Sequence, residues 1–163
     1  MDLKKLSDQY RDELLNNVLP FWLQNSQDKE FGGYFTCLDR EGKVFDTDKF
    51  IWLQGREVWM FSMLYNKVEK RQEWLDCAVQ GGEFLKKYGH DRNYNWYFSL
   101  DRSGRPLVEP YNIFSYTFAT MAFGQLSLAT GNQEYADIAR KTFDIILSKA
   151  DNPKGKWNKL HPG

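Results

Sequence analysis

Residues 34–43 read YFTCLDREGK and residues 97–105 read YFSLDRSGR, so the chain repeats a short motif. Both copies end in Leu-Asp-Arg-x-Gly followed by a basic residue, and Asp39 and Asp101 are 101 − 39 = 62 residues apart. Each copy is typical of a β-hairpin, because a β-prone run leads into a turn closed by glycine, which tolerates positive φ. The repeat indicates an array of similar structural units.

Each predicted hairpin is followed by a segment with almost no charge. Residues 53–65 carry Arg56 and Glu57 as their only charged side chains, and residues 111–130 carry none. A helix that is apolar on nearly all sides is typically buried on nearly all sides. The second segment is long enough for a membrane span, but its seven Asn, Ser, Thr and Gln side chains favour an interior helix of a soluble protein.

Three other segments mix apolar and charged residues with helical periodicity. They are residues 3–24, 73–88 and 134–149, and the last two match each other at a spacing of 61 residues. Amphipathic helices of this kind lie half-exposed on the outside of a protein. Pro20 is expected to kink or end the first of them. The apolar stripe of that helix consists of Leu14, Leu15, Val18, Leu19 and Trp22.

The alternation of outer helix, hairpin and inner helix predicts an all-α fold, an α/α toroid with short β-hairpins between its helices. Six repeats of this period would need 6 × 62 = 372 residues, and 163/62 gives about 2.6 repeats. We therefore expect residues 1–163 to form a single domain that is the N-terminal portion of such a toroid. The alternative is a small open array, which would need polar caps, whereas the last residues read NPKGKWNKLHPG.

The charge balance excludes two classes of partner. Lys and Arg together number 22, as do Asp and Glu, so the chain has neither the basic patch of a nucleic-acid binder nor an affinity for anionic membranes. The N-terminal residues contain no apolar core of a signal peptide. Two cysteines, Cys37 and Cys77, do not make a disulfide framework, so we predict a cytoplasmic protein.

Motifs for cofactors and metals are not found in the sequence. Gly155-Lys156 lacks the upstream glycine of a phosphate-binding loop, and no His/Cys cluster has zinc-ligand spacing. We expect neither a cofactor nor a metal. The 27 aromatic residues (6 Trp, 9 Tyr and 12 Phe) can fill a core or line a sugar cleft, and for any single ring the core is favoured.

The segment from Val18 to Asn66 resembles the opening of the N-acylglucosamine 2-epimerase family. Its most specific run is WLQGREVWM, from Trp52 to Met60, at the start of the first inner helix. The resemblance continues more weakly over residues 78–85 and 113–122. The wider group includes cellobiose 2-epimerases and aldose–ketose isomerases, so the resemblance defines the fold better than the substrate.

This resemblance implies an (α/α)6 barrel whose site lies in a cleft at one end of the inner helices. It also implies epimerisation at C2 of a sugar with its ring open, in which a base removes the C2 proton and an acid returns one to the other face. The family's acid–base histidines lie in the later half of the barrel, beyond residue 163. His90 and His161 lie in predicted loops, so no catalytic residue is assigned, and the 163-residue chain alone is expected to be inactive.

Arg56 is the candidate for stabilising the anion formed during the reaction, since the family's matching arginine contacts the sugar. An internal ion pair of Arg56 with Glu57 or Asp48 is the structural alternative. Four further residues are candidate sugar contacts, and Tyr34 is a weaker one of the same sort. They are Trp52 and Phe114, which occupy equivalent repeat positions, together with Tyr111 and Gln54.

Two other functions compete with a homo-oligomeric sugar epimerase. A glycoside hydrolase or lyase on a similar toroid would need a carboxylate pair, for which Asp39 and Asp101 are candidates. Each of them, however, opens an Asp-x-x-Gly turn in which the carboxylate can accept its own backbone N–H groups. A non-catalytic module, stable only as an oligomer, would expose a large apolar face, which the uncharged segment 111–130 could supply.

Overall fold

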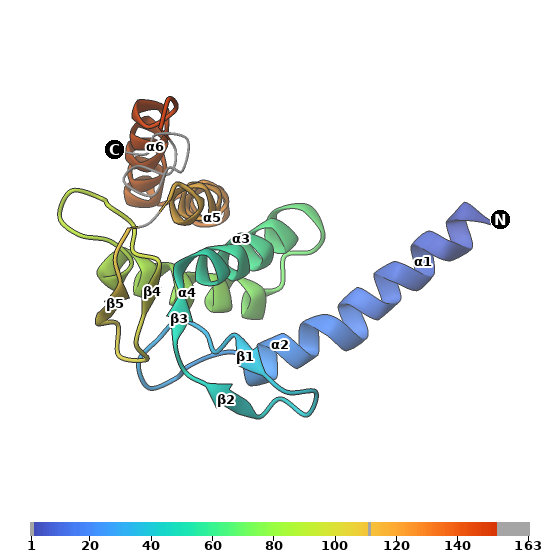
Figure 1. The fold of residues 1–163 in the computed structure, drawn as a ribbon. Coiled ribbons are helices and arrows are strands. Elements are labelled where there is room, and N and C mark those ends of the chain that lie inside the picture. Colours follow the sequence, from blue (N-terminus) through green and yellow to red (C-terminus); the bar gives the residue numbers. More distant parts are fainter. Residues whose placement is uncertain (1, 111, 153–163) are drawn as a thin grey trace.

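The computed structural model describes residues 2–110 and 112–152, which form a helical layer edged by short strands (Figure 1). The helices of this part are α1 (Leu3–Glu13), α2 (Leu19–Asn25), α3 (Ile51–Lys67), α4 (Gln72–Tyr88), α5 (Phe114–Thr130) and α6 (Gln133–Ser148), with a π-helical turn η1 (Leu14–Val18). The strands are β1 (Cys37–Leu38), β2 (Val44–Asp46), β3 (Lys49–Phe50), β4 (Ser99–Leu100) and β5 (Pro106–Val108).

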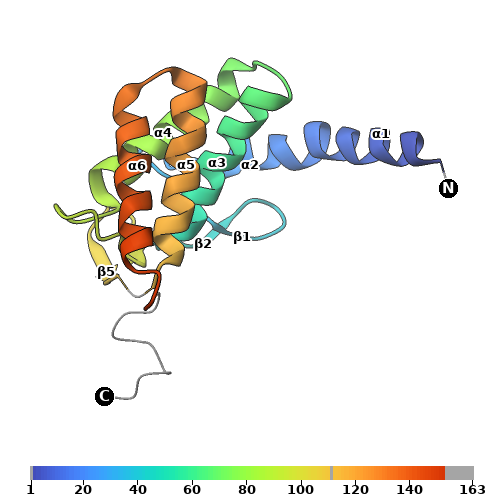
Figure 2. The same ribbon diagram turned by 90° about the horizontal axis from the view of Figure 1, so that it is seen from above.

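The predicted inner and outer helices are confirmed. Helices α3 and α5 lie side by side, α4 packs on α3, and α6 packs on α5 (Figure 2). The outer helices α4 and α6 each bury one stripe, as their mixed sequences predict, and α6 buries Tyr135, Ile138 and Thr142. No helix among the described residues is both long and apolar enough to cross a membrane.

The uncharged helix α5 is buried on one side and exposed on another within the part of the chain that the structure describes. Phe114, Met121 and Leu128, spaced seven residues apart, are 60%, 43% and 70% exposed. The positions 62 residues earlier lie on α3, and two of them contact α5: the Trp52 ring packs on Phe118, and the Asn66 amide donates to Gln125 O at 3.0 Å. The positions through which α3 contacts α5 are thus exposed to solvent where they recur on α5.

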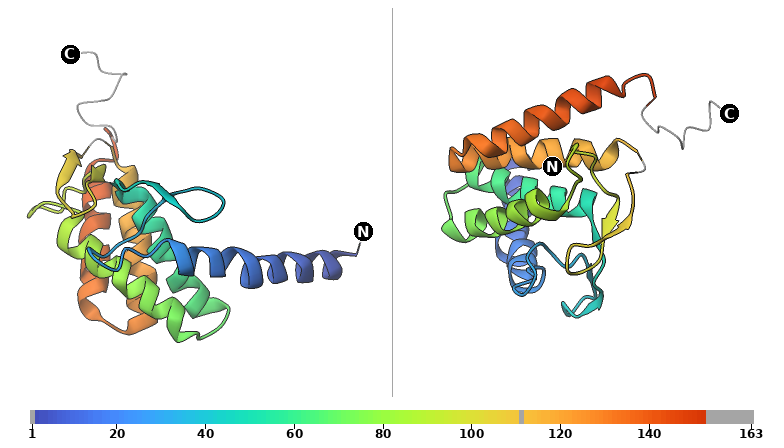
Figure 3. Two further views of the ribbon diagram at one scale, coloured as in Figure 1. Left: turned by 90° about the horizontal axis from the view of Figure 1, so that it is seen from below. Right: turned by 90° about the vertical axis from the view of Figure 1, so that its left-hand side faces the viewer.

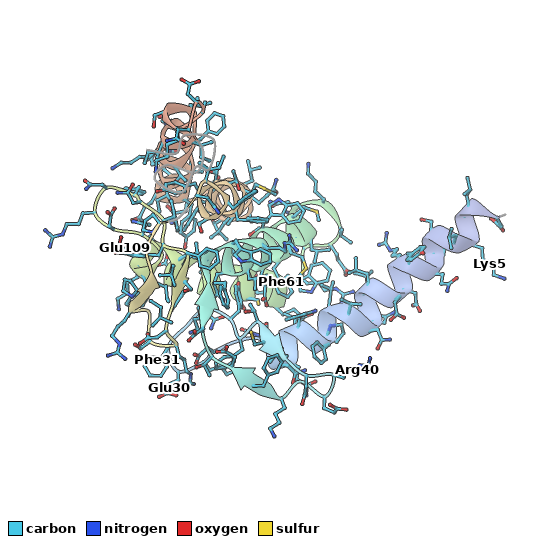
Figure 4. All side chains as sticks on the ribbon, in the orientation of Figure 1. Lys5, Glu30, Phe31, Arg40, Phe61 and Glu109 are labelled. Atoms are coloured by element: carbon cyan, nitrogen blue, oxygen red, sulfur yellow. The ribbon has the colours of Figure 1, made fainter. Side chains whose placement is uncertain are left out.

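The interior is built from large apolar side chains of several elements. Phe61 of α3 has no exposed surface and lies inside the helical layer (Figure 4). Trp74 of α4 is equally buried, and Trp96, from the loop before β4, donates its indole N–H to Thr142 Oγ1 at 3.1 Å. That bond satisfies a polar group that the core would otherwise leave unpaired.

Both predicted hairpins are present, as β1–β2 and β4–β5. The Asp39 carboxylate accepts the Lys43 N–H at 2.8 Å, and the Asp101 carboxylate accepts the Arg105 N–H at 2.9 Å. Gly42 and Gly104 have φ of +84° and +96°, which explains the glycine in each motif. The sequence did not predict that β3 pairs with β4 and so joins the two repeats in one three-stranded sheet.

The first predicted outer helix differs from the expectation. It does not end at Pro20 but widens before it, and the Leu19 N–H donates to Leu14 O, five residues back. Since Pro20 has no N–H and its ring crowds the preceding turn, a π-helical turn relieves both problems. Helix α1 extends away from the other helices (Figure 3), with Lys5 near its free end (Figure 4), and has no buried residue.

A group of charges joins the segments before α3 to the second hairpin, and we call its members Asp28, Lys49 and Arg102 the Asp28 cluster. The Lys49 ammonium donates to Asp28 Oδ2 at 3.0 Å and to the carbonyl oxygens of Gly32 and Arg102 at 2.6 and 2.8 Å. The Arg102 guanidinium donates to both carboxylate oxygens of Asp28. Asp28 and Lys49 have no exposed surface, whereas the Arg102 side chain is 37% exposed, so the cluster is a buried ion pair covered by a partly exposed arginine.

The charges of this cluster persist at neutral pH. Burial raises the pKa of Asp28, but hydrogen bonds from Arg102 and Lys49 outweigh it and lower that pKa to about 2. Burial lowers the pKa of Lys49, and its bond to Asp28 acts in the opposite direction. The cluster therefore holds the loop after α2, strand β3 and the second hairpin together by ionic hydrogen bonds.

We expect Asp28→Asn to lower the free energy of unfolding by about 3–5 kcal/mol, because it leaves the Lys49 ammonium buried without a carboxylate. Urea unfolding at pH 7 measures this loss, and Asp8→Asn on exposed α1 is the control, with a change within about 0.5 kcal/mol. The folded pKa of Asp28 lies below its ordinary value of 3.8, so its contribution should be lost as pH falls from 3.8 toward 2. Equal stability of the two variants would contradict the role of the cluster.

Candidate active site

The start of α3 is set by contacts with both hairpins. The Ile51 N–H donates to Phe98 O at 3.0 Å, just before β4. One turn later, the Gln54 side chain brackets the backbone of Tyr34: Oε1 accepts the Tyr34 N–H and Nε2 donates to Tyr34 O, both at 2.8 Å. These bonds fix the direction in which the next turn of α3 presents its side chains.

Gln54 and Tyr34, predicted as candidate sugar contacts, are buried in the described structure. Neither has exposed surface, and both amide atoms of Gln54 are used by the Tyr34 backbone. The Tyr34 hydroxyl donates to Cys77 O at 2.7 Å, and burial raises its pKa well above the ordinary value. Their polar side-chain atoms form hydrogen bonds inside the protein, and these bonds hold the start of α3 in place.

Arg56 is exposed at the start of α3 and rests on aromatic rings. Its guanidinium carbon lies 5.2 Å from the ring centre of Trp52 and 5.2 Å from that of Phe118, and the two ring centres are 5.9 Å apart. We call these three residues the Arg56 cluster. The three distances are similar, so the guanidinium caps a pair of rings instead of lying between them, and its outer side faces solvent.

No carboxylate of the described residues forms an ion pair with Arg56. The ion pairs considered from the sequence, with Glu57 or Asp48, are therefore not formed. A guanidinium keeps its proton at any relevant pH and has five N–H donors. The Arg56 cluster thus combines an unneutralised cation with aromatic faces.

Phe118 of α5 was not predicted as a site residue. It lies 118 − 56 = 62 residues after Arg56, so the two occupy equivalent positions of successive repeats, which is the signal that could have identified it. Gly55 brings the two helices together at this point, because a Cβ on Gly55 would lie 3.0 Å from the backbone C and O atoms of Phe118. The close approach places the Phe118 ring against Arg56.

Glu57, although adjacent to Arg56, is turned into the protein. It is 7% exposed, and burial raises its pKa to about 8, against the opposite influence of a hydrogen bond with Ser26. Ser26 Oγ lies 2.5 Å from Glu57 Oε1 and 2.7 Å from Trp22 O. One hydroxyl has one proton, so a protonated Glu57 donating to Ser26, which in turn donates to Trp22 O, satisfies all three groups.

The other groups near Glu57 do not favour its charge. Tyr34 and Cys77 interact with it electrostatically, and burial raises the pKa of both. Neither is a cation that could offset the cost of burying a carboxylate. Burial thus raises the pKa of Glu57 to about 8, and among the described residues Glu57 forms no ion pair with Arg56.

The remaining residues singled out in the sequence lie in different places. Trp52 belongs to the Arg56 cluster, Phe114 is exposed on α5 one turn before Phe118, and Tyr111 and His161 lie outside the described residues. His90, in the loop after α4 as predicted, stacks on Tyr94 at 4.3 Å. Its Nδ1 lies 2.7 Å from Asp91 O. Over residues 2–110 and 112–152, no three His, Cys, Asp or Glu side chains are grouped as metal ligands.

The inner helices α3 and α5, covered by the amphipathic helices α4 and α6, define part of an α/α helical array, and Arg56 is exposed on aromatic faces near the start of α3. The sequence profile described as "N-acylglucosamine 2-epimerase (GlcNAc 2-epimerase)" matches residues 33–162. The chain therefore belongs to the N-acylglucosamine 2-epimerase family, a family of isomerases, and the resemblance noted in the sequence is confirmed.

Relatives in sequence and structure agree with this assignment. The N-acylglucosamine 2-epimerase of Bos taurus is 42% identical over 154 residues, which cover 91% of this chain and 36% of the bovine protein. The cellobiose 2-epimerase of Dictyoglomus turgidum is 29% identical over 97% of this chain and 42% of its own length. The structure of Spirochaeta thermophila cellobiose 2-epimerase has a TM-score of 0.82 at 24% identity, over 90% of this chain and 36% of that one.

The coverage and the structural similarity of these relatives test the predicted fold. The chain spans between 36% and 42% of the length of these three relatives. The all-α fold class is confirmed, with the helical hairpins of one portion of an (α/α)6 barrel.

We expect Gly55→Ala to destabilise the protein by about 1–3 kcal/mol, because its methyl group would press on the backbone at Phe118. Gly124→Ala, in the middle of α5, is the matched control, since nothing lies within 4 Å of the added Cβ. It should stabilise the protein by about 0.5–1 kcal/mol through helix propensity alone. Urea unfolding compares the two, and a change of the same sign in both would refute the close approach.

Glu57 predicts a specific pH dependence of stability. Its folded pKa of about 8 lies above the ordinary value of 4.5, so the unfolded chain loses this proton first. Stability from Glu57 should be complete below pH 4.5 and fall by up to about 1.4 kcal/mol per pH unit toward pH 8. In Glu57→Gln this slope should vanish. Urea unfolding from pH 5 to 8 tests it, and parallel curves for the two proteins would contradict a neutral Glu57.

Proposed function

We propose that this chain supplies part of the substrate site of a sugar 2-epimerase, in which Arg56 stabilises the anion formed from an open-chain sugar. Removal of the C2 proton places negative charge on the sugar oxygens, and a fixed cation at that position lowers the barrier. The observation that carries the proposal is the exposed Arg56 guanidinium, held on two rings and free of any carboxylate among the described residues.

The proton-transfer residues are not assigned to the described part of the chain. His90 is engaged with Tyr94 and Asp91, and no contact joins it to the Arg56 cluster. In the proposal, the acid and base come from later repeats of the barrel. Residues 1–163 then form its first repeats as a single domain and have no turnover alone.

The family membership supports an N-acylated hexosamine as the substrate. Identity to the bovine N-acylglucosamine 2-epimerase is 42%, against 29% to the cellobiose 2-epimerase of Dictyoglomus turgidum. In the proposal, Trp52 and Phe114 offer ring faces to the sugar, and Tyr111 is a further contact. Arg56 provides donors to the oxygens at C1 and C2.

A glycoside hydrolase is disfavoured by the state of its candidate carboxylates. Asp39 accepts the backbone N–H groups of Glu41 and Lys43 in its turn. Asp101 accepts the Arg105 N–H and is also paired with the Arg105 guanidinium at 2.7 Å. Both carboxylates are engaged in holding their own hairpins, as expected of turn residues.

The proposal also includes a setting in cytoplasmic carbohydrate metabolism and self-association. Balanced charge and the free thiols of Cys37 and Cys77 support a reducing compartment. The exposed stripe of Phe114, Met121 and Leu128 supports an apolar contact between copies. Sedimentation as a monomer at all concentrations would argue against self-association.

The test is sugar 2-epimerisation by the chain at its full natural length, followed as deuterium incorporation at C2 of N-acetylmannosamine by NMR. We expect turnover by the wild type and a fall of at least about 100-fold in Arg56→Ala, as on loss of a group that stabilises a transition-state anion. Arg56→Lys should recover only part of it, because an ammonium lacks the planar set of donors.

Arg40→Ala, an exposed arginine at the tip of the first hairpin (Figure 4), is the control and should leave the rate unchanged. Full activity of Arg56→Ala would remove Arg56 from the site. Turnover of cellobiose but not of N-acetylmannosamine would overturn the proposed substrate class.

A further inference from the structure

The side chain of Arg56 is held in place without any polar partner among the described residues. Its guanidinium carbon lies 5.2 Å from the ring centre of Trp52 and 5.2 Å from that of Phe118. Arginine has many rotamers, so an exposed arginine without such contacts would point in several directions. The rings are what gives the guanidinium a defined direction.

The two rings do not contribute in the same way. Trp52 precedes Arg56 by four residues on α3, so their contact is local and forms in any helix with this sequence. Phe118 comes from α5, in the next repeat, and is the member of the cluster that ties Arg56 to a second helix. Only Phe118 can orient Arg56 relative to the neighbouring inner helix.

The position of Phe118 is itself well defined by the packing of α3 on α5. At one end of the contact Gly55 admits the Phe118 backbone, with a distance of 3.0 Å from an added Cβ. At the other end the Asn66 amide donates to Gln125 O at 3.0 Å and Oε1 at 3.1 Å. These two contacts set the register of the two helices, which lie side by side in Figures 1 and 2.

We propose that Phe118 is a positioning residue for Arg56: its ring, presented by the second repeat, orients the guanidinium of the first repeat toward the sugar. This inference rests on the proposed function, in which Arg56 meets the anion. Positions 56 and 118 are equivalent in the repeat but then have different roles: Arg56 carries the charge, and the Phe118 ring orients the guanidinium. Phe118 need not touch the substrate to affect the reaction.

Removing the ring should impair the reacting state more than substrate binding, because the donors of Arg56 are needed most where charge develops. We expect Phe118→Met, which keeps the bulk and removes the ring, to lower kcat about three- to tenfold with KM changed less than twofold. Phe118→Tyr keeps the ring and should restore kcat. Phe143→Met removes an exposed ring of α6 and is the matched control.

A second readout reports on Arg56 directly and needs no sugar. The Nε–Hε signal of Arg56 in the 15N–1H NMR spectrum, assigned by its loss in Arg56→Lys, should be displaced by ring currents in the wild type. It should move toward the ordinary arginine position in Phe118→Met and remain in place in Phe118→Tyr and Phe143→Met. Phe118 is only partly buried, so we expect Phe118→Met to fold. Urea unfolding of the variant verifies this.

The outcomes separate the two proposals. An Arg56 signal that does not respond to Phe118→Met overturns the positioning role, whatever the activity. A signal that responds while kcat is unchanged also overturns it, since the contact would then have no effect on the reaction. A wild type that is inactive on N-acylhexosamines defeats the proposed function, and the positioning role with it, although a responding NMR signal would still establish the contact.

Discussion

The Asp28 cluster is the constraint on which the rest of this structure depends. Asp28 follows α2, Lys49 lies in the strand that enters α3, and Arg102 lies in the turn of the second hairpin. Three segments separated by up to 102 − 28 = 74 residues thus meet at one carboxylate. Burying an ammonium and a carboxylate is tolerable only when each is fully hydrogen-bonded, so the cluster allows little variation in how the two repeats join.

That junction determines what α3 presents at its start. Successive residues of an α-helix point about 100° apart, so Arg56 and Glu57 face different surroundings although they are neighbours in sequence. Arg56 is exposed on aromatic rings, whereas Glu57 is buried against Ser26, and burial raises the pKa of its carboxyl group to about 8. Two neighbouring residues that could form an ion pair are thus separated, with the Arg56 guanidinium at the surface and the Glu57 carboxyl group in the interior.

Much of this arrangement could be predicted from the sequence, because it follows from periodicity and turn chemistry. The 62-residue spacing of Asp39 and Asp101 identified both hairpins, and the nearly uncharged segments identified α3 and α5. Arg56 could be singled out as the one cation of a segment whose only other charge is Glu57, and by its match to an arginine of the family that the sequence resembles.

The roles of individual polar and aromatic residues could not be predicted in the same way. Gln54 has the residue type of a sugar ligand, but its partner is a backbone segment 20 residues away that only the fold brings near. Phe118 and the β3–β4 pairing likewise depend on contacts between repeats, and the π-helical turn before Pro20 is a local adjustment that helical periodicity does not record. The 62-residue spacing of Arg56 and Phe118 was the one sequence signal that related residues of the two helices.

Helix α1 illustrates how unevenly order is distributed along this chain. It has 11 residues and no buried side chain, and it continues through the π-helical turn into α2, whose Leu19 is anchored in the core. Unwinding α1 would therefore expose no residue of the described core. Any further stability of this helix must come from a surface against which it packs.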